Sequence, residues 1–216
     1  MPLKINLSTV MGNNRVPLEP EKIYHYYHHA VGNDNLFFQE RNYTYFLQKY
    51  AEHLHGIFET YCYCLLPNHF HFLVKVRQLS ELEQPLLHLN QSKMRLSDKL
   101  AHKVGSFQSA YAKAISKQED RRGALFVQSF GRKEITTPNY FRRAVHYIHK
   151  NAVHHGIVRD MGDWPHTSYH SYLSSKHSRL KREQVMDEFG GQRCFIDYHK
   201  HVPVDTSLAL EMEDFF

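Results

Sequence analysis

The segment LLPNHFHFLVKV, residues 65–76, combines a turn with a strictly alternating pattern. Successive side chains of a β-strand point to opposite faces, so residues two apart share a face. After a turn at Pro67 and Asn68, the pattern therefore predicts a strand over residues 69–76. One face suits a hydrophobic core and carries Phe70, Phe72, Val74 and Val76. The other face is expected to be open and carries His69, His71, Leu73 and Lys75.

Residues 58–66, FETYCYCLL, precede the turn and also alternate. They predict a second strand, with Phe58, Thr60, Cys62 and Cys64 on one face and Tyr61 and Tyr63 on the other. Two alternating strands joined by a tight turn form an antiparallel hairpin. Cys62 and Cys64 are expected in the strand core rather than at a zinc ion, because no second cysteine pair accompanies them.

Further elements can be assigned around the hairpin from their patterns. Strand-like segments cover residues 23–31 and 124–135, and helical spacing covers residues 42–54, 97–118, 140–151 and 182–189. Gly105 interrupts the second of these helical patterns, so one broken helix or two are expected there. The order strand, helix, strand, strand, helix, strand is that of a ferredoxin-like split βαβ domain of the α+β class. Its antiparallel sheet is expected to carry helices on one face.

The remaining segments predict appendages to this one domain. Residues 1–20 are rich in glycine, asparagine and proline and are expected to form an N-terminal arm. Residues 21–151 contain the ferredoxin-like pattern. Residues 152–216 are expected to form a helical C-terminal extension packed on the same domain, since 216 residues suffice for a single core.

The composition narrows the class of protein. Three cysteines argue against a disulfide framework and for a reducing compartment. No apolar run approaches the ~18 residues of a membrane span, and no secretory signal begins the chain, so a cytoplasmic protein without a membrane partner is expected. The formal charge is +5, and the basic residues are dense between residues 113 and 143. Such a stretch fits either phosphate binding or ordinary solvated helix faces.

The histidines of the second strand are candidate metal ligands. His69 and His71 are two apart on a predicted strand, so both side chains should project from one face. Two other His-x-His triplets lack this context, because one ends a predicted helix and the other lies in a polar tail: His53/His55 and His199/His201. The pattern therefore favours a metal site at His69 and His71, with exposed strand histidines as the alternative.

The segment LLPNHFHFLVKV resembles the HUH motif of the single-tyrosine transposases, in which two histidines flank a bulky apolar residue. Other segments of this chain also resemble the REP-associated tyrosine transposases and their insertion-sequence relatives. YHYYHHAVGNDNLFFQERNYTYFLQKY resembles their opening strand, turn and helix, and FQSAYAKAISKQEDRRGALF resembles their tyrosine helix and basic turn. YIHKNAVHHGIV followed by DWPHTSYHSYL is similar to their C-terminal signature. The resemblance extends from about residue 22 to about residue 175.

The resemblance implies a mechanism and roles for individual residues. His69 and His71 would hold a divalent metal, magnesium or manganese, with zinc still open. Tyr111 would be the nucleophile that forms a 5′-phosphotyrosine on a cleaved strand. On the residues alone, Tyr111 also fits an apolar core stripe with Phe107 and Ile115.

Two positions depart from the family pattern. Relatives carry Gln or Asn four or five residues beyond the tyrosine, where this chain has Ile115 and Ser116. The third metal ligand therefore stays open among Ser116, Gln108 and Gln118, with Ser116 slightly favoured. The C-terminal signature usually has Asn-Pro, and this chain has Asn151 and Ala152.

The resemblance also implies single-stranded or hairpin DNA as the partner. Stacking aromatics and backbone cations are the expected DNA contacts: Lys75, Tyr61, Tyr63, Lys113, Arg121, Arg122, Arg132 and Lys133. A domesticated DNA hairpin-binding protein with little or no cleavage is the alternative, and an unrelated metal hydrolase is a third interpretation. The oligomeric state is left open between monomer and homodimer.

Overall fold

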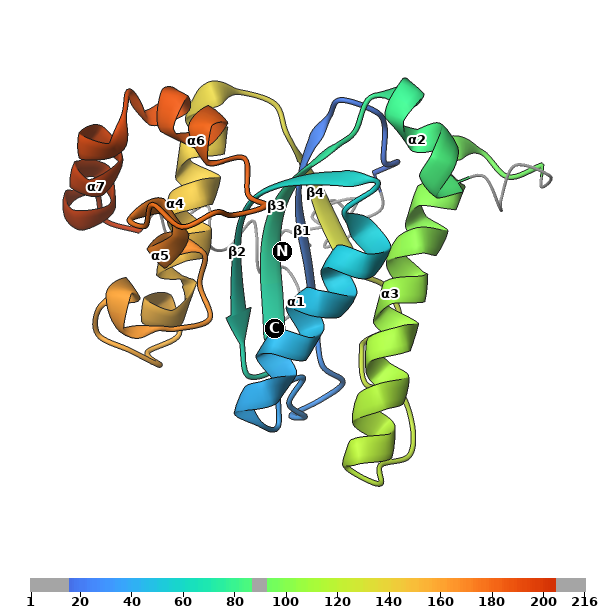
Figure 1. Ribbon diagram of the computed structural model, residues 1–216. Coiled ribbons are helices and arrows are strands. Elements are labelled where there is room, and N and C mark those ends of the chain that lie inside the picture. The colour runs from blue at the N-terminus through green and yellow to red at the C-terminus, as the bar shows by residue number, and fades with distance from the viewer. Residues whose placement is uncertain (1–15, 87–92, 205–216) are drawn as a thin grey trace, which may run out of the picture.

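The computed structural model describes residues 16–86 and 93–204. Four antiparallel strands form one sheet in the order β2-β3-β1-β4 (Figure 1). Their bounds are Ile23–His29 for β1, Phe58–Leu66 for β2, His69–Val76 for β3 and Gly131–Ile135 for β4. The ferredoxin-like α+β fold expected from the element order is confirmed.

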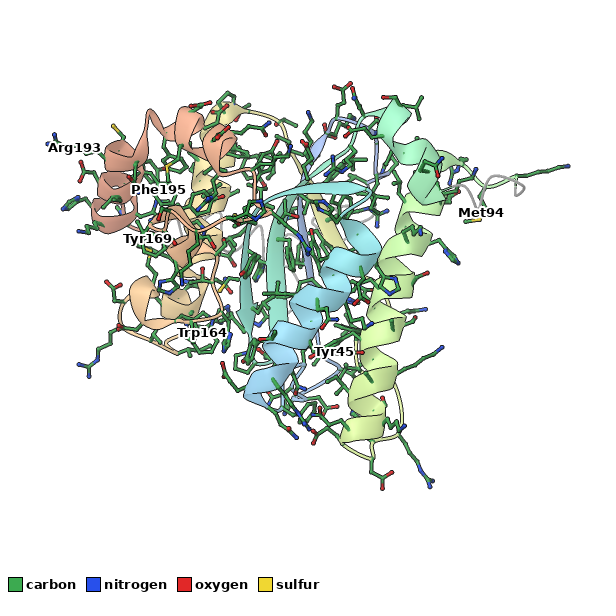
Figure 2. The ribbon with its side chains drawn as sticks, viewed as in Figure 1. Tyr45, Met94, Trp164, Tyr169, Arg193 and Phe195 are labelled. Atoms are coloured by element: carbon green, nitrogen blue, oxygen red, sulfur yellow. The ribbon has the colours of Figure 1, made fainter. Side chains whose placement is uncertain are left out.

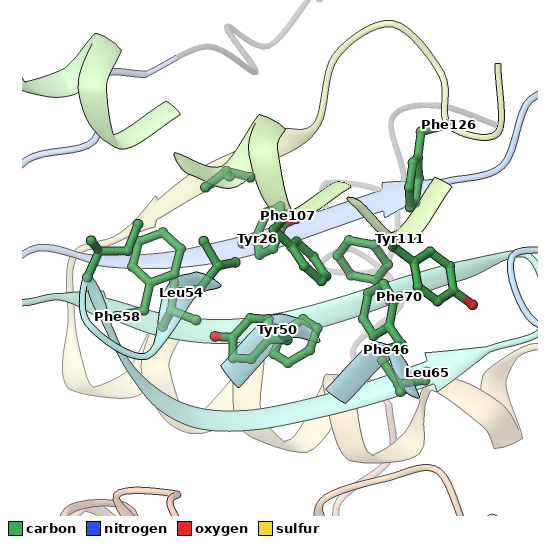
Figure 3. Close-up of a cluster of buried hydrophobic side chains, with 14 of the residues drawn as sticks. Tyr26, Phe46, Tyr50, Leu54, Phe58, Leu65, Phe70, Phe107, Tyr111 and Phe126 are labelled. Atoms are coloured by element: carbon green, nitrogen blue, oxygen red, sulfur yellow. The ribbon is translucent and has the colours of Figure 1, made fainter. Parts of the chain in front are cut away.

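The two crossover helices, α1 (Glu40–Leu54) and α3 (Leu96–Gln118), pack side by side on one face of the sheet (Figure 1). A short helix, α2 (Leu79–Leu86), follows β3. The side chains between these helices and the sheet form a largely aromatic core (Figure 3). Phe70, Phe72, Val74 and Val76 of β3 belong to it, as their alternation predicts.

The second face of the sheet is covered, which contradicts the expectation that it would be open. Helix α4 (Pro138–His154) packs on β2 and β3. Short helices of the C-terminal extension surround it: η3 (Met161–Asp163), α5 (Tyr169–Tyr172), α6 (Arg182–Phe189) and α7 (Gln192–His201) (Figure 1). Tyr169 and Phe195 lie within this layer (Figure 2) and belong to a second core that includes Leu73 and Ile148. The expectation failed because α4 has an apolar stripe of its own, which it buries against this face.

Two local features differ from the sequence-based expectation. Helix α3 is continuous through Gly105, although a glycine inside a helix costs about 1 kcal/mol relative to alanine. Strand β2 carries a register shift between Thr60 and Cys62. Such a bulge inserts one residue and reverses the alternation beyond it. Tyr61 therefore packs with the α4 layer, whereas Tyr63 faces the α1 side.

The C-terminal extension also covers the outer edge of β2. The backbone N–H of Leu65 donates to the backbone carbonyl of His166, and the backbone N–H of Ser168 donates to that of Tyr63. The indole N–H of Trp164 donates to the Leu65 carbonyl at 2.9 Å. An uncovered strand edge is a pairing hazard, so these contacts protect the sheet. In the described residues, no helix is both long and apolar enough for a bilayer crossing.

Candidate functional site

His69 and His71 project from the same face of β3, as predicted. Their ring centroids are 5.1 Å apart and their planes are nearly perpendicular, at 87°. Helix α4 covers them, so their exposed fractions are only 4% and 2%. The two imidazoles therefore converge in a buried layer between the sheet and α4, and not on a solvent-facing surface.

Hydrogen bonds orient both imidazoles through their Nδ1 atoms. His69 Nδ1 lies 2.8 Å from Asn68 Oδ1, which accepts a hydrogen bond when this nitrogen carries the proton. His71 Nδ1 lies 2.8 Å from Nε2 of His25, on the neighbouring strand β1. Where Nδ1 of either residue carries the proton in these contacts, its Nε2 is available as a lone-pair donor.

An unsatisfied ring nitrogen at this place fits a cation. His71 Nε2 is buried and has no hydrogen-bond partner in the described part of the chain. Asn151 Oδ1 lies 3.2 Å from His69 Nε2, so two lone pairs face each other when the proton of His69 is on Nδ1. A divalent ion between them would turn this repulsion into attraction.

The chemistry of the donor set is that of two neutral imidazoles and an amide. Burial, followed by the neighbouring His25 and His69, holds the pKa of His71 well below its ordinary value. A neutral imidazole is the form that binds a metal. Within residues 16–86 and 93–204, no three His, Cys, Asp or Glu side chains form a metal-binding group. A third protein ligand would therefore be the Asn151 amide.

Tyr147 of α4 lies beside these groups. Its ring is edge-on to His71 at 5.7 Å between centroids and to His25 at 6.4 Å. Residues four apart share a helix face, so Tyr147 and Asn151 are directed to the same place. Only 1% of Tyr147 is exposed. Helix α4 thus brings a tyrosine and an amide to the two histidines.

Tyr111 lies on the opposite face of the sheet, so the predicted pairing of this tyrosine with His69 and His71 is wrong. Its ring is edge-on to Phe46 at 4.8 Å in the aromatic core (Figure 3). Its hydroxyl donates to the Leu36 carbonyl at 2.7 Å. Burial raises the pKa of Tyr111 well above the ordinary value for a tyrosine. These are the contacts of a core tyrosine.

The candidates for a third ligand on α3 are equally remote. Gln108 donates to Tyr26 and to His28 within the α1 and α3 core, and Gln118 bonds with Asn42. Ser116 is half-buried on the same helix, α3. The sheet separates all three from His69 and His71. The prediction of Ser116 as a metal ligand is therefore wrong for the same geometric reason.

A signal for Tyr147 and Asn151 was present in the sequence. The family resemblance implies a polar residue, often Gln or Asn, four or five positions beyond the tyrosine, and Asn151 stands four positions beyond Tyr147. Tyr111 fails this criterion. The spacing within YIHKNAV could therefore have identified the helix that faces the histidines. His25 carried no such signal, because its role depends on strand pairing.

The predicted DNA contacts are scattered over the molecule. Tyr61 and Lys75 line one cavity of about 390 Å³ at the start of α4. Tyr63 packs on Phe72 on the other face, with centroids 5.6 Å apart. Lys133 pairs in register with His25 on the histidine face. A single continuous surface of the predicted residues is therefore absent from the described part of the chain.

The other basic candidates differ in how far they are engaged. Arg121 forms an ion pair with Asp34 and a hydrogen bond to Ala124. The guanidinium of Arg132 donates to the Val16 carbonyl and lies over the Phe130 ring. Lys113 and Arg122 are exposed. Of the predicted cations, these last two are the most accessible to a phosphate backbone.

Comparisons with known proteins agree with the fold described above. No protein-family model matches the chain. A Haemophilus influenzae protein described as a REP-associated tyrosine transposase is 25% identical over 137 residues, which cover 63% of this chain and 69% of that protein. A solved structure of a REP-associated tyrosine transposase bound to a REP hairpin superposes with a TM-score of 0.56. It covers 76% of this chain and 87% of its own, at 16% identity. The resemblance to the REP-associated tyrosine transposases is confirmed. The chain shares the overall fold of that solved structure.

Proposed function

We propose that this chain is a metal-dependent DNA strand transferase and nuclease that acts on single-stranded or hairpin DNA, with Tyr147 as its nucleophile. The observation that carries the proposal is the placement of Tyr147 and Asn151 over His69 and His71. A tyrosine, two imidazoles and an amide are the groups that a tyrosine transposase of this family needs. The relatives named above are the reason to choose DNA as the substrate.

His69, His71 and Asn151 would hold the metal. The proposed ion is magnesium or manganese, with water or phosphate oxygens completing the coordination beside the two nitrogens and the amide oxygen. When bound, such an ion polarises a phosphate and stabilises negative charge on its oxygens. The chain itself supplies the orientation of the ligands through Asn68 and His25.

Tyr147 would attack the phosphorus of the scissile phosphodiester. The new bond joins the phenolic oxygen to phosphorus, and the bond from phosphorus to the 3′ oxygen breaks. The phenol releases one proton and the departing 3′ oxygen takes one up, which leaves a 5′-phosphotyrosine and a 3′-OH. Attack by a 3′-OH on the phosphotyrosine reverses the step and rejoins DNA. The phosphodiester energy is retained, so no nucleotide cofactor is required.

The burial of Tyr147 sets a condition on this chemistry. At 1% exposure, its hydroxyl is reached by a phosphate only after neighbouring side chains have moved. Catalytic contacts often become complete only in the substrate complex. His154 at the end of the helix is exposed, and its ring centroid lies 6.1 Å from that of Tyr147.

The test is a covalent protein–DNA adduct. Wild-type protein is incubated with Mn²⁺ and a 5′-labelled or 3′-labelled hairpin-bearing single strand, and the products are separated under denaturing conditions. Only the fragment that begins with the cleaved 5′-phosphate should stay with the protein, and this fragment carries the 3′ label. Tyr147→Phe should abolish the adduct, whereas Tyr111→Phe, the matched control, should retain it. Chelation of the metal should stop cleavage.

Two results would change the proposal. An adduct that persists in Tyr147→Phe and disappears in Tyr111→Phe would reinstate the prediction from the sequence. Hairpin binding by the wild type without any adduct, across metals and strands, would favour the alternative of a domesticated hairpin-binding protein. Peptide mapping of the adduct identifies the modified tyrosine directly.

A further inference from the structure

His25 occupies the centre of the sheet and is fully buried. Strand β1 pairs with β3 on one side and with β4 on the other, and His25 shares its face with His69 and His71. Its Nε2 lies 2.8 Å from His71 Nδ1. The two rings are nearly parallel, at 9°, so the lone pair of one nitrogen lies close to the plane of the other ring. Buried imidazoles so arranged share one proton in a directed hydrogen bond.

The direction of this hydrogen bond determines what His71 can do. If His71 Nδ1 donates, its Nε2 is unprotonated and can bind a metal. If His25 Nε2 donates instead, the proton of neutral His71 moves to Nε2, the atom on the metal side. Metal-binding histidines commonly donate their second N–H to a carboxylate or a carbonyl, which orients the ring. In this protein, the acceptor for the second N–H of His71 is the neutral imidazole of His25.

Tyr27 holds His25 in this position. The two rings stack with centroids 4.7 Å apart and planes within 19°. The Tyr27 ring also lies against Gly131 of β4, where an added Cβ would be only 2.2 Å from the ring. Any side chain at position 131 would therefore displace Tyr27. Gly131, Tyr27 and His25 form a packed series across three strands that ends at His71.

We propose that His25 is a positioning residue that fixes the tautomer and the ring plane of His71, and that Tyr27 packed over Gly131 clamps it. The part of this inference that concerns metal binding by His71 rests on the proposed function. The tautomer of His71 does not depend on it. His25 approaches this centre through Nε2, which is directed at His71 Nδ1, so it is assigned a positioning role and not a ligand role. Asn68 performs the corresponding task for His69 from the turn. His71 is thus oriented from strand β1 and His69 from the turn between β2 and β3.

The first measurement is the tautomer of His71 in the metal-free protein, by imidazole ¹⁵N NMR. The wild type should show His71 protonated on Nδ1. His25→Phe keeps an aromatic ring but removes the acceptor, so the Nε2-protonated form of His71 should become populated. His25→Gln places an amide oxygen near the former Nε2 and should restore the wild-type tautomer. An unchanged His71 tautomer in His25→Phe would overturn the inference.

The second measurement is binding of Mn²⁺ alone, by calorimetry. Loss of an outer hydrogen-bond partner typically weakens metal binding by about 10-fold to 100-fold, and this is expected for His25→Phe. His146→Phe is the control, because His146 is a buried histidine of α4 that contacts Tyr198 and His199 instead. Equal Mn²⁺ affinity in His25→Phe and wild type would overturn the inference. Absence of Mn²⁺ binding in the wild type would instead count against the proposed function, and the tautomer would still decide this inference.

Two glycine variants test whether Tyr27, packed on Gly131, holds His25 in place. Gly131→Ala should displace Tyr27 and weaken Mn²⁺ binding in the same direction as His25→Phe, although it touches no ligand. Gly105→Ala on α3 is the matched control, since nothing lies within 4 Å of its added Cβ. Thermal unfolding of each variant separates a positional effect from loss of the fold. Wild-type affinity and tautomer in a folded Gly131→Ala protein would exclude the clamp.

Discussion

Tyr147 and Tyr111 are both almost fully buried, at 1% and 0% exposure, yet their surroundings differ. The Tyr111 hydroxyl is used by a backbone carbonyl within an apolar core. The Tyr147 ring is bordered by two imidazoles. A catalytic group needs neighbours that can change the charge around it, and a core tyrosine needs only space and one hydrogen bond. Burial alone therefore does not separate the two roles.

Two histidines outside the candidate centre should make stability depend on pH. His28 Nε2 donates to the Val127 carbonyl and its Nδ1 accepts from Gln108, so His28 is neutral. Burial lowers the pKa of His28 to about 3, and burial lowers the pKa of His199 to about 3 as well. Both values lie below the unfolded value near 6.5, so the unfolded chain binds more protons and stability falls as the pH drops from about 6.5 towards about 3.

The expected size of this effect can be measured by urea unfolding at several pH values. Each histidine should contribute a loss of roughly 2 kcal/mol between pH 8 and pH 5. Replacing His28 and His199 with Gln should flatten the curve over this interval, even if the variant is less stable at pH 8. A wild-type stability that is constant between pH 8 and pH 5 would contradict the prediction.

Helix α4 combines two tasks at the scale of one element. Its apolar residues, including Val145 and Ile148, bury against the sheet and the C-terminal helices. Tyr147 and Asn151 occupy the adjoining stripe above the histidines. Thr137 caps the first turn by accepting from the Tyr140 N–H at 3.1 Å, and Pro138 follows at the first helical position. The orientation of the candidate ligands therefore depends on the packing of the same helix.

Asn151 provides a test of α4 as a source of ligands. Asn151→Ala should weaken Mn²⁺ binding by at least about tenfold, because one donor is lost. Asn151→Asp should bind Mn²⁺ at least as tightly as the wild type, since a carboxylate is a better ligand for a hard cation. Calorimetric titration with Mn²⁺ measures both. If Asn151→Ala bound as the wild type does, Asn151 would be a structural residue of α4 only.

The whole molecule carries its excess positive charge unevenly. The formal charge is +5, and several of the central arginines already have partners inside the fold. Arg121 pairs with Asp34, whereas Arg122 is exposed and forms no ion pair with another described residue. Two neighbouring arginines that the sequence ranks equally are therefore expected to differ in DNA binding.

The salt dependence of hairpin binding tests this difference. Arg122→Ala should reduce the slope of log affinity against log salt by about 1, as expected for one lost phosphate contact. Arg121→Ala should change the slope less, and should lower stability through loss of the Asp34 pair. Fluorescence anisotropy over a salt series measures the slope. Equal slopes in Arg122→Ala and wild type would show that Arg122 lies outside the DNA contact surface.

The alternation in residues 69–76 by itself determined the hairpin, the core face of β3 and the shared face of His69 and His71. It could do so because side chains of a strand without a bulge, such as β3, alternate strictly between the two faces. Helical spacing likewise identified α1, α3, α4 and α6. It could not determine which side of the sheet each helix covers, because a buried stripe looks the same on either side. Tertiary packing decided that α3 carries Tyr111 into one core while α4 carries Tyr147 and Asn151 to the histidines. Strand pairing likewise decided the partnership of His25 with His71, since residues 46 apart in sequence meet only when β1 lies beside β3.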